Sequence, residues 1–285
     1  MNNNNIIIKM STILVEQNDG ITFLNSLPDN SVDLILTDPP YIISKDSGMD
    51  KFVDEVAKLD ASGKNKKTEK EWEEFKKKKG YDNDDYKSNY IKYGNASGNK
   101  YAFKTDYGIW DKEFTINKLE EFVKLFYKKL RKGGTCIIFF DLWKLETLKS
   151  IMERAKTNKT GFKQIRFIEW VKTNPVPLNQ KINYLTNSRE CALLGVKGGK
   201  PTFNSKYDNG IYKFPIQAGK SRTHPTQKSL PLFEELIKKH SNEGDLVVDP
   251  FLGGGTTAFA CKNTNRRFTG CEIDTKYIDI IQKSL

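Results

Sequence analysis

One short segment near the start of the chain does most to restrict how it can fold. The apolar run at residues 32–36 leads into the segment Thr37-Asp38-Pro39-Pro40-Tyr41. Such a run predicts a buried strand, and the two prolines fix φ, lack an N–H donor and keep the chain extended. A carboxylate, free carbonyl groups and an aromatic ring are therefore expected at the carboxyl end of a strand, where open α/β sheets bind ligands. These groups suit a planar base that carries an exocyclic amine.

The rest of the chain has the rhythm of a parallel α/β sheet, because short apolar runs alternate with stretches of helical spacing. Strands are predicted at residues 13–15, 34–37, 135–140, 165–171, 191–196, 246–248 and 268–273. Helices are predicted at residues 21–27, 117–130, 144–155, 230–240 and from 255 to 261. Residues 131–134 are expected to end one of these helices, and residues 198–222 to form a loop.

The composition suits one large α/β domain with an insertion. Of the 285 residues, 37% are apolar and 29% are charged, so both a substantial core and a charged surface are available. The formal net charge of +11 favours a polyanionic partner, most simply nucleic acid. Lysine enrichment through codon usage would give the same charge, so charge alone does not decide between the two explanations.

Several classes of protein are disfavoured. The cysteines form no Cys-x-x-Cys pair and the two histidines lack zinc spacing, so we expect no metal site. The first five residues lack the basic region of a signal peptide, and no apolar run approaches the ~20 residues that span a bilayer. We therefore expect a cytoplasmic protein with reduced, mostly buried thiols at Cys136, Cys191, Cys261 and Cys271.

A segment of different character, residues 42–108, interrupts the α/β pattern. Residues 64–80 hold eight lysines and four glutamates, and apolar residues look too sparse for a core. We expect an insertion that is helical around residues 69–79 and partly mobile. A solvated charged helix without a binding role would have the same composition. Because the insertion follows Tyr41 directly, a contact with the ligand of that turn is the other interpretation.

A second candidate site is the glycine-rich turn at residues 249–257, between a predicted strand and a helix. Gly253, Gly254 and Gly255 let the backbone approach a ligand closely, and the helix start presents free N–H groups. The spacing fits neither the dinucleotide nor the P-loop pattern, and a tight strand–helix junction would look the same. Glu272, at the end of the next strand, is placed to bind both hydroxyls of a ribose, which favours a cofactor that contains a nucleoside.

Asp19 has two interpretations that the sequence leaves open. It follows the first predicted strand, so its carboxylate would lie at the ligand-binding edge of the sheet and could accept a hydrogen bond from the amine of an adenine. It also precedes a predicted helix, where aspartate commonly caps free N–H groups.

Three motifs occur in a fixed order along the chain. They are Thr37-Asp38-Pro39-Pro40-Tyr41, His224-Pro225-Thr226-Gln227-Lys228-Ser229-Leu230 and Asp249-Pro250-Phe251-Leu252-Gly253-Gly254-Gly255-Thr256-Thr257. Together they resemble the S-adenosylmethionine-dependent amino-methyltransferases of DNA, most closely the β class of N6-adenine methyltransferases. The order implies a circularly permuted Rossmann-like methyltransferase fold, a mostly parallel α/β sheet flanked by helices. Ser229 stands where that family has Pro, Gly254 stands where it often has Ser, and residues 42–108 have no counterpart.

The resemblance implies an enzyme that transfers a methyl group from S-adenosylmethionine to N6 of a flipped-out adenine in double-stranded DNA. Asp38 and the carbonyl of Pro39 would accept the two amine hydrogens, Pro40 would keep the turn rigid, and Tyr41 would stack on the base. The residues implied to bind the cofactor are Asp19, Thr37, Asp38, Thr226, Lys228, Asp249, Phe251, Gly253, Gly255, Thr256 and Glu272.

The resemblance also divides the chain. Residues 1–41 and 109–285 would form the catalytic domain. The insertion at residues 42–108 and the segment at residues 173–222, in both of which aromatic and basic residues alternate, would compete for target recognition. Thr226 and Lys228 would contact the carboxylate end of the cofactor.

Other activities remain open on the same scaffold. N4-cytosine methyltransferases more often have Ser at the position of Asp38, and relatives that methylate RNA or protein glutamine usually have Asn there. A non-catalytic DNA-binding subunit is a further alternative. The expected partners are double-stranded DNA, a second copy of the chain in a homodimer and a separate cognate restriction endonuclease, in the cytoplasm of a prokaryotic or phage-infected cell.

Overall fold

The computed structural model describes residues 12–42, 58, 61–96, 114–157, 160–175, 186–217 and 227–285. The chain forms two compact units, of which the larger comprises residues 1–42 and 111–285 and the smaller residues 43–110.

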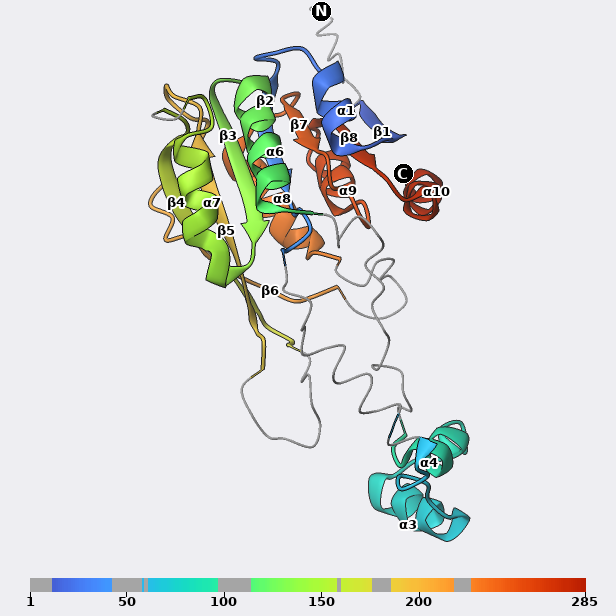
Figure 1. The fold of residues 1–285 in the computed structure, drawn as a ribbon. Helices are drawn as coiled ribbons and strands as arrows, with labels where there is room; N and C mark the ends of the chain where they lie inside the picture. Colours follow the sequence, from blue (N-terminus) through green and yellow to red (C-terminus); the bar gives the residue numbers. More distant parts are fainter. Residues whose placement is uncertain are drawn as a thin grey trace, which may run out of the picture. The chain divides into compact units, whose positions relative to one another are not determined.

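The larger unit is built on one sheet, which has eight strands in the described part of the chain, in the order β1-β8-β7-β2-β3-β5-β4-β6 (Figure 1). Strands β1, β8, β7, β2 and β3 run parallel to one another, whereas β5 is antiparallel to both β3 and β4. The strands are β1 (Ile13–Gln17), β2 (Val32–Thr37), β3 (Leu130–Phe140), β4 (Lys163–Lys172), β5 (Arg189–Val196), β6 (Ile211–Phe214), β7 (Leu246–Asp249) and β8 (Arg267–Glu272). The predicted mostly parallel sheet is confirmed.

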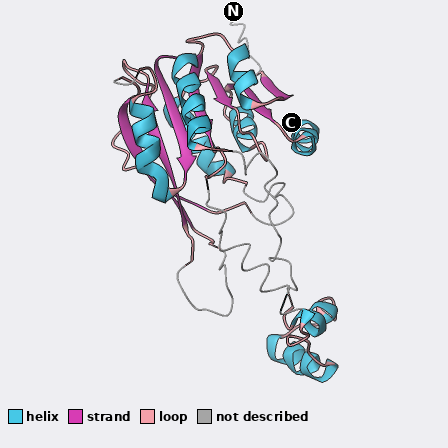
Figure 2. Ribbon diagram, in the orientation of Figure 1, coloured by secondary structure: helices cyan, strands magenta, loops and turns pink. Residues whose placement is uncertain are grey.

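Helices cover both faces of this sheet (Figures 1 and 2). Residues of β2 and β3 alternate between two cores because successive side chains point to opposite faces. Ile35 and Ile138 pack with α1 (Gly20–Ser26), α6 (Ile116–Lys129) and α7 (Leu145–Glu153). Leu36 and Ile137 pack on the other face with α8 (Leu230–His240), α9 (Thr256–Asn263) and α10 (Thr275–Ser284). Burial on both faces explains why these strands are continuously apolar.

Three details of the larger unit differ from the prediction. Strand β6 lies inside the segment predicted as a loop, and α10 was not predicted. Residues 131–134 do not end a helix but lie within β3, whose pairing with β2 shifts register between Val32 and Leu34. Gly133, at φ +80°, supplies the backbone conformation that this irregularity needs.

The smaller unit contains α3 (Glu69–Lys79) and α4 (Lys87–Tyr93). Thr68 and Glu71 form a reciprocal cap at the start of α3, which confirms the predicted helix. The expectation that apolar residues are too sparse for a core was wrong. Trp72 is fully buried, and its ring packs with those of Phe75, Tyr81 and Tyr90, so aromatic rings form a small core that aliphatic patterning does not reveal.

Within the described residues, no helix has the length and apolar character needed to cross a membrane.

Candidate active site

The predicted site residues lie at one edge of the sheet. Strands β1, β8, β7 and β2 are parallel neighbours, so their carboxyl ends lie side by side. Asp19 follows β1, Glu272 ends β8, Asp249 ends β7 and Asp38 follows β2. The order of the strands therefore brings together four carboxylates that the sequence spreads over more than 250 residues.

Asp38 is one end of a buried ionic chain. Its Oδ2 lies 2.7 Å from Nζ of Lys228, which is also 2.6 Å from Oε2 of Glu190. The other carboxylate oxygen of Glu190 lies 2.8 Å from Nζ of Lys172. The side chains of Asp38 and Glu190 are each only 20% exposed, and that of Lys228 is 9% exposed. Two carboxylates and two ammonium groups therefore balance one another in this chain.

Several polar atoms beside this chain lack a partner. Oδ1 of Asp38, the hydroxyl of Tyr41 and Oγ of Ser229 are buried and make no hydrogen bond of normal geometry in the described part of the chain, although the hydroxyl of Tyr41 lies near enough to the Asp38 carboxylate to lower its pKa. A buried polar group without a partner costs free energy, so such groups require an explanation. A ligand that offers hydrogen-bond donors and acceptors at this place would satisfy them.

The charges in this pocket shift one another's pKa. Burial raises the pKa of Asp38, while the positive charge of Lys228 acts in the opposite direction. Burial by itself would lower the pKa of Lys228, but the carboxylates of Asp38 and Glu190 raise it well above its ordinary value. Lys228 is therefore an ammonium ion at neutral pH. Burial raises the pKa of Tyr41 well above its ordinary value, so its hydroxyl stays protonated.

The ring of Tyr41 is held against the protein. It meets the ring of Phe140 edge-on, with centroids 5.9 Å apart, and the ammonium group of Lys228 lies 5.5 Å from its centroid. Pro39 is buried beside it and Pro40 is half-buried. The turn is thus fixed by packing as well as by its prolines.

Asp249 connects three elements at the sheet edge. Its Oδ1 accepts hydrogen bonds from the hydroxyl of Thr37 (2.7 Å) and from the N–H of Phe251 (3.0 Å), and its Oδ2 accepts one from the hydroxyl of Thr257 (2.6 Å). The carboxylate is 3% exposed, and burial raises its pKa to about 6. In this structure Asp249 and Thr37, both predicted to bind the cofactor, bond to each other and shape the turn.

The glycine turn has the backbone geometry of a close-approach site. Gly253 and Gly255 have φ of +51° and +83°, and a Cβ on Gly255 would lie 2.9 Å from Cγ1 of Ile281. Helix α9 begins at Thr256, which is buried, and no side chain caps its first turn. The ring of Phe251 packs on that of Phe122, with centroids 4.5 Å apart. This packing holds the turn in place, and the start of α9 carries a partial positive charge.

Glu272 and Asp19 bond to the backbone next to this turn. Oε2 of Glu272 accepts a hydrogen bond from the N–H of Gly253 (2.7 Å), and its Oε1 accepts from the next two residues. Burial raises the pKa of Glu272. Oδ1 of Asp19 accepts from the N–H groups of Ile21 and Thr22 (2.9 and 3.2 Å). The capping interpretation of Asp19 is thus confirmed, while its contact with a cofactor stays a prediction.

Two further residues, Thr226 and Lys228, were predicted to bind the carboxylate end of the cofactor. Thr226 lies outside the described residues. Lys228 lies against Asp38 and Glu190, and its contact with a cofactor carboxylate stays a prediction.

The four cysteines are free and buried, as predicted. The described residues contain no cluster of side chains that could hold a metal ion. Glu190 and Lys172 were not predicted, because they come from β5 and β4, whose places in the sheet no local motif indicates.

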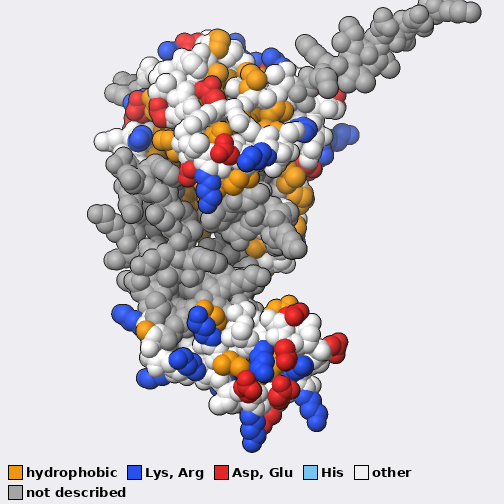
Figure 3. Space-filling view, turned by 90° about the vertical axis from the view of Figure 1, so that its right-hand side faces the viewer, with side chains coloured by type: hydrophobic (Ala, Val, Ile, Leu, Met, Phe, Trp, Pro, Cys, Tyr) orange, Lys and Arg blue, Asp and Glu red, His pale blue; other side chains and the backbone are white. Residues whose placement is uncertain are grey.

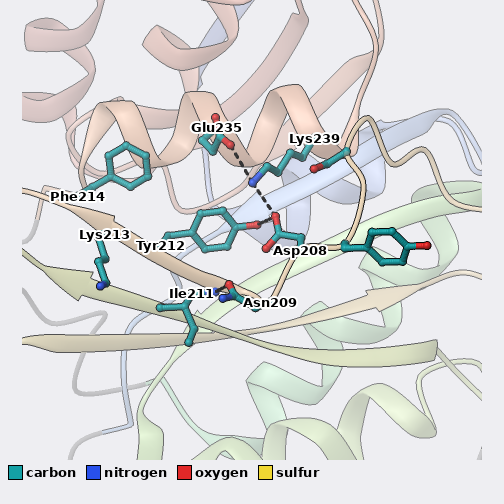
Figure 4. A pocket seen from close by; sticks show the side chains of 10 residues that line it. Asp208, Asn209, Ile211, Tyr212, Lys213, Phe214, Glu235 and Lys239 are labelled. Carbon is teal, nitrogen blue, oxygen red and sulfur yellow. Dashed lines mark hydrogen bonds and ion pairs between the residues drawn. The ribbon is translucent and has the colours of Figure 1, made fainter.

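The second candidate recognition segment contains a groove beside β6 and α8 (Figure 4). Nζ of Lys239 lies between the carboxylates of Asp208 (2.6 Å) and Glu235 (2.8 Å), and the hydroxyl of Tyr212 donates to Asp208 (2.9 Å). Lys239 is therefore already neutralised. Tyr207, an aromatic residue of this segment, lines the same groove and is fully exposed.

Residues 32–283 match the sequence model of a family described as DNA methylase. The type II methyltransferase M2.DpnII of Streptococcus pneumoniae is 27% identical over 97% of this chain and 90% of its own length. The type II methyltransferase M.HpaI of Haemophilus parainfluenzae is 27% identical over 94% of this chain and 72% of its own length.

Solved structures share the fold. The SAM complex of M1.HpyAVI has a TM-score of 0.60 and 24% identity, over 95% of this chain and 98% of that one. The cytosine-N4-specific PvuII DNA methyltransferase has a TM-score of 0.62 and 14% identity, over 96% of this chain and 86% of that one.

Proposed function

The chain belongs to the DNA methylase family, and from that premise we propose that it transfers a methyl group from S-adenosylmethionine to N6 of an adenine in duplex DNA. The observation that carries this proposal is the carboxylate of Asp38. One of its oxygens is bonded to Lys228, and the other is buried without a hydrogen-bond partner among the described residues, at the end of a strand where a base can be held. An amine with two hydrogens supplies the missing partner.

The residues present fit the proposed cofactor. S-adenosylmethionine carries an adenosine, a carboxylate and, on its sulfonium centre, an already activated methyl group. The uncapped start of α9 and the two glycines with positive φ suit its methionine part and carboxylate. Glu272, next to that turn, would hold the ribose, Asp19 the adenine amine, and Phe251 would lie beside the cofactor. Thr226 is proposed for the carboxylate end, whereas the contact of Lys228 with it stays a prediction, because that ammonium group already lies between the carboxylates of Asp38 and Glu190.

Catalysis then rests on positioning and electrostatics. Oδ1 of Asp38 accepts one hydrogen of the exocyclic amine and the carbonyl of Pro39 accepts the other. These bonds would draw the nitrogen towards tetrahedral geometry and free its lone pair from the ring to attack the methyl carbon. The bond between that carbon and the sulfonium sulfur would break, S-adenosylhomocysteine would leave, and the methylated nitrogen would then give up one proton. The carboxylate also stabilises the positive charge that develops on nitrogen. Tyr41 holds the face of the base, which must leave the duplex to reach the pocket.

Adenine is the proposed base and N4 of cytosine is the alternative, because both present an exocyclic amine. Expression in a host without DNA methylases, followed by sequencing that detects modified bases, separates them. We expect N6-methyladenine at one short sequence. N4-methylcytosine would overturn the choice of base but not the family. The absence of any modified base, together with retained cofactor binding, would support a non-catalytic subunit.

Two segments are proposed to contact DNA, the insertion at residues 42–108 and the segment at residues 173–222. The described part of the insertion carries lysines and acids on the same surface (Figure 3), and Lys76 is paired with Asp84 at 2.7 Å. The neighbouring Lys77, Lys78 and Lys79 are exposed at the last turn of α3.

We further propose that the protein is located in the cytoplasm. The partners that we propose are a second copy of the chain, in a homodimer, and a separate restriction endonuclease.

We expect the triple variant Lys77→Gln, Lys78→Gln, Lys79→Gln to bind DNA about ten-fold or more weakly at low salt. The slope of log affinity against log salt should fall by up to about 3, since each phosphate contact contributes ~0.9. A matched control changes three exposed lysines elsewhere, Lys124, Lys149 and Lys283, and should keep the wild-type slope. Equal slopes for the wild type and the triple variant would show that this cluster is only a solvated surface.

A further inference from the structure

We propose that Glu190, acting through Lys228, is a positioning residue for Asp38. The buried chain from Glu190 to Lys228 to Asp38 fixes one oxygen of the Asp38 carboxylate and presents the other to the target amine. This inference rests on the proposed function, because it takes Asp38 as the acceptor of that amine.

The fold places this chain at the ligand-binding edge. Strand β5 runs antiparallel to β3, and Cys191 pairs with Phe140 at the carboxyl end of β3. Glu190 precedes Cys191, so it emerges at the same edge as Asp38 although it stands at the start of its strand. Lys228 reaches the same place from the residues just before α8. Three separate elements of the sheet and the α8 layer thus supply one contiguous set of charges.

The geometry gives Lys228 a specific task. Its ammonium group is 2.7 Å from Oδ2 of Asp38 and 2.6 Å from Oε2 of Glu190, and it lies 5.5 and 5.6 Å from the ring centroids of Tyr41 and Phe139. Carboxylates on two sides and aromatic rings around it leave the ammonium group little freedom. Oδ2 of Asp38 is therefore held, and Oδ1 is the oxygen that has no hydrogen-bond partner in the part of the chain that the structure describes.

Glu190 also tunes how strongly Asp38 accepts a hydrogen bond. If Lys228 were paired with Asp38 alone, its full positive charge would act on that carboxylate and would make Asp38 a weaker hydrogen-bond acceptor. Because Glu190 shares the ammonium, and Lys172 in turn lies 2.8 Å from Glu190, the four charges balance, as a buried ionic cluster requires. Among the described residues, the other titratable groups that act on Asp38 are Tyr41 and the carboxylate of Asp249.

Removing the charge of Glu190 has a distinctive consequence for pH dependence. The negative charge of Glu190 raises the pKa of Asp38, and that of Lys228 lowers it. In Glu190→Gln the Asp38 pKa should fall, so the acid limb of the profile of kcat/KM against pH should move to lower pH. In Lys228→Met the limb should move to higher pH. A residue with only a structural role would lower activity without moving the limb.

The test measures kcat, KM for DNA, cofactor affinity and the pH profile of the full-length enzyme. For Glu190→Gln we expect kcat to fall about ten-fold, a cofactor Kd within about three-fold of wild type, and an acid limb about half a unit lower or more. Lys228→Met should lose about 100-fold in kcat or more, and Lys228→Arg should recover part of it, because a guanidinium group can also bridge two carboxylates.

A matched control is Asp29→Asn. Asp29 pairs with the buried ammonium of Lys129 at 2.8 Å, at the opposite end of β2, so it should change neither kcat nor the acid limb. A Glu190→Gln profile that superimposes on the wild type, with unchanged kcat, would overturn the inference and leave the proposed function standing. Full activity of Asp38→Asn would instead overturn the role of Asp38, and the inference with it.

Discussion

Replacement of Asp38 by alanine should lower kcat by about three orders of magnitude and leave the Kd for S-adenosylmethionine within a few-fold of the wild-type value. Loss of one preorganised group that stabilises developing charge typically costs ~100- to 1,000-fold, and Asp38 supplies both a hydrogen-bond acceptor and a negative charge. The cofactor turn at Gly253–Gly255 does not bond to Asp38, so cofactor binding should survive. Single-turnover methylation and calorimetric titration measure the two quantities.

The structure indicates that this variant still folds. Without Asp38, Lys228 keeps its partner Glu190 at 2.6 Å, so no buried charge is left alone. Asp38→Asn keeps the shape of the side chain and tests the charge alone, and it should be nearly as inactive. Glu120→Gln changes a carboxylate that pairs with Arg154 and should behave as wild type. Activity of Asp38→Ala within ten-fold of wild type would contradict the proposed role.

Most of the site could be predicted because its residues share a simple structural rule. Asp38, Asp249 and Glu272 each stand at the end of an apolar run, and in a parallel sheet such ends meet at one edge. The order of the motifs identified an S-adenosylmethionine-dependent DNA methyltransferase, which the family match over residues 32–283 confirms. The local sequence was sufficient here since strand, turn and helix start are adjacent along the chain.

Glu190 could not be predicted in the same way. It stands at the start of a strand, and it reaches the ligand edge only because β5 runs antiparallel to β3. Nothing in the residues around it specifies that direction or the register with Phe140. The link from Glu190 through Lys228 to Asp38 therefore depends on a long-range strand pairing, which sequence periodicity does not carry.

In the smaller unit, the sequence pattern predicted the helix but not the core. Residues 69–79 were predicted as a helix from their composition, and the cap at Thr68 explains where it starts. The core was missed because it is aromatic: Trp72 packs with rings from α3, α4 and the turn between them. A single tryptophan can bury as much area as several aliphatic residues, so counting apolar residues underestimates such a core.

Substitution of Asp249 is expected to have a large effect on the stability of the fold. Asp249→Ala should lower the free energy of unfolding by about 3 kcal/mol, because the hydroxyls of Thr37 and Thr257 and the N–H of Phe251 would lose their acceptor, at ~1 kcal/mol or more for each buried group. For a chain of this size the melting temperature should fall by about 6–12 °C. Cofactor affinity should drop about ten-fold or more, since these bonds shape the glycine turn.

Asp249→Asn separates the shape of this carboxylate from its charge. Burial raises the pKa of Asp249 to about 6 in the folded protein, above the ~3.9 of an unfolded chain. Between these values the folded state binds more protons, so this group's contribution to stability is largest below about pH 4, falls as the pH rises to about 6, and is constant above it. The stability advantage of wild type over Asp249→Asn should therefore shrink by up to about 3 kcal/mol from pH 4 to pH 7. Denaturant titrations of both proteins across this range measure it, and an advantage that grows with pH would show that the folded protein favours the ionised form.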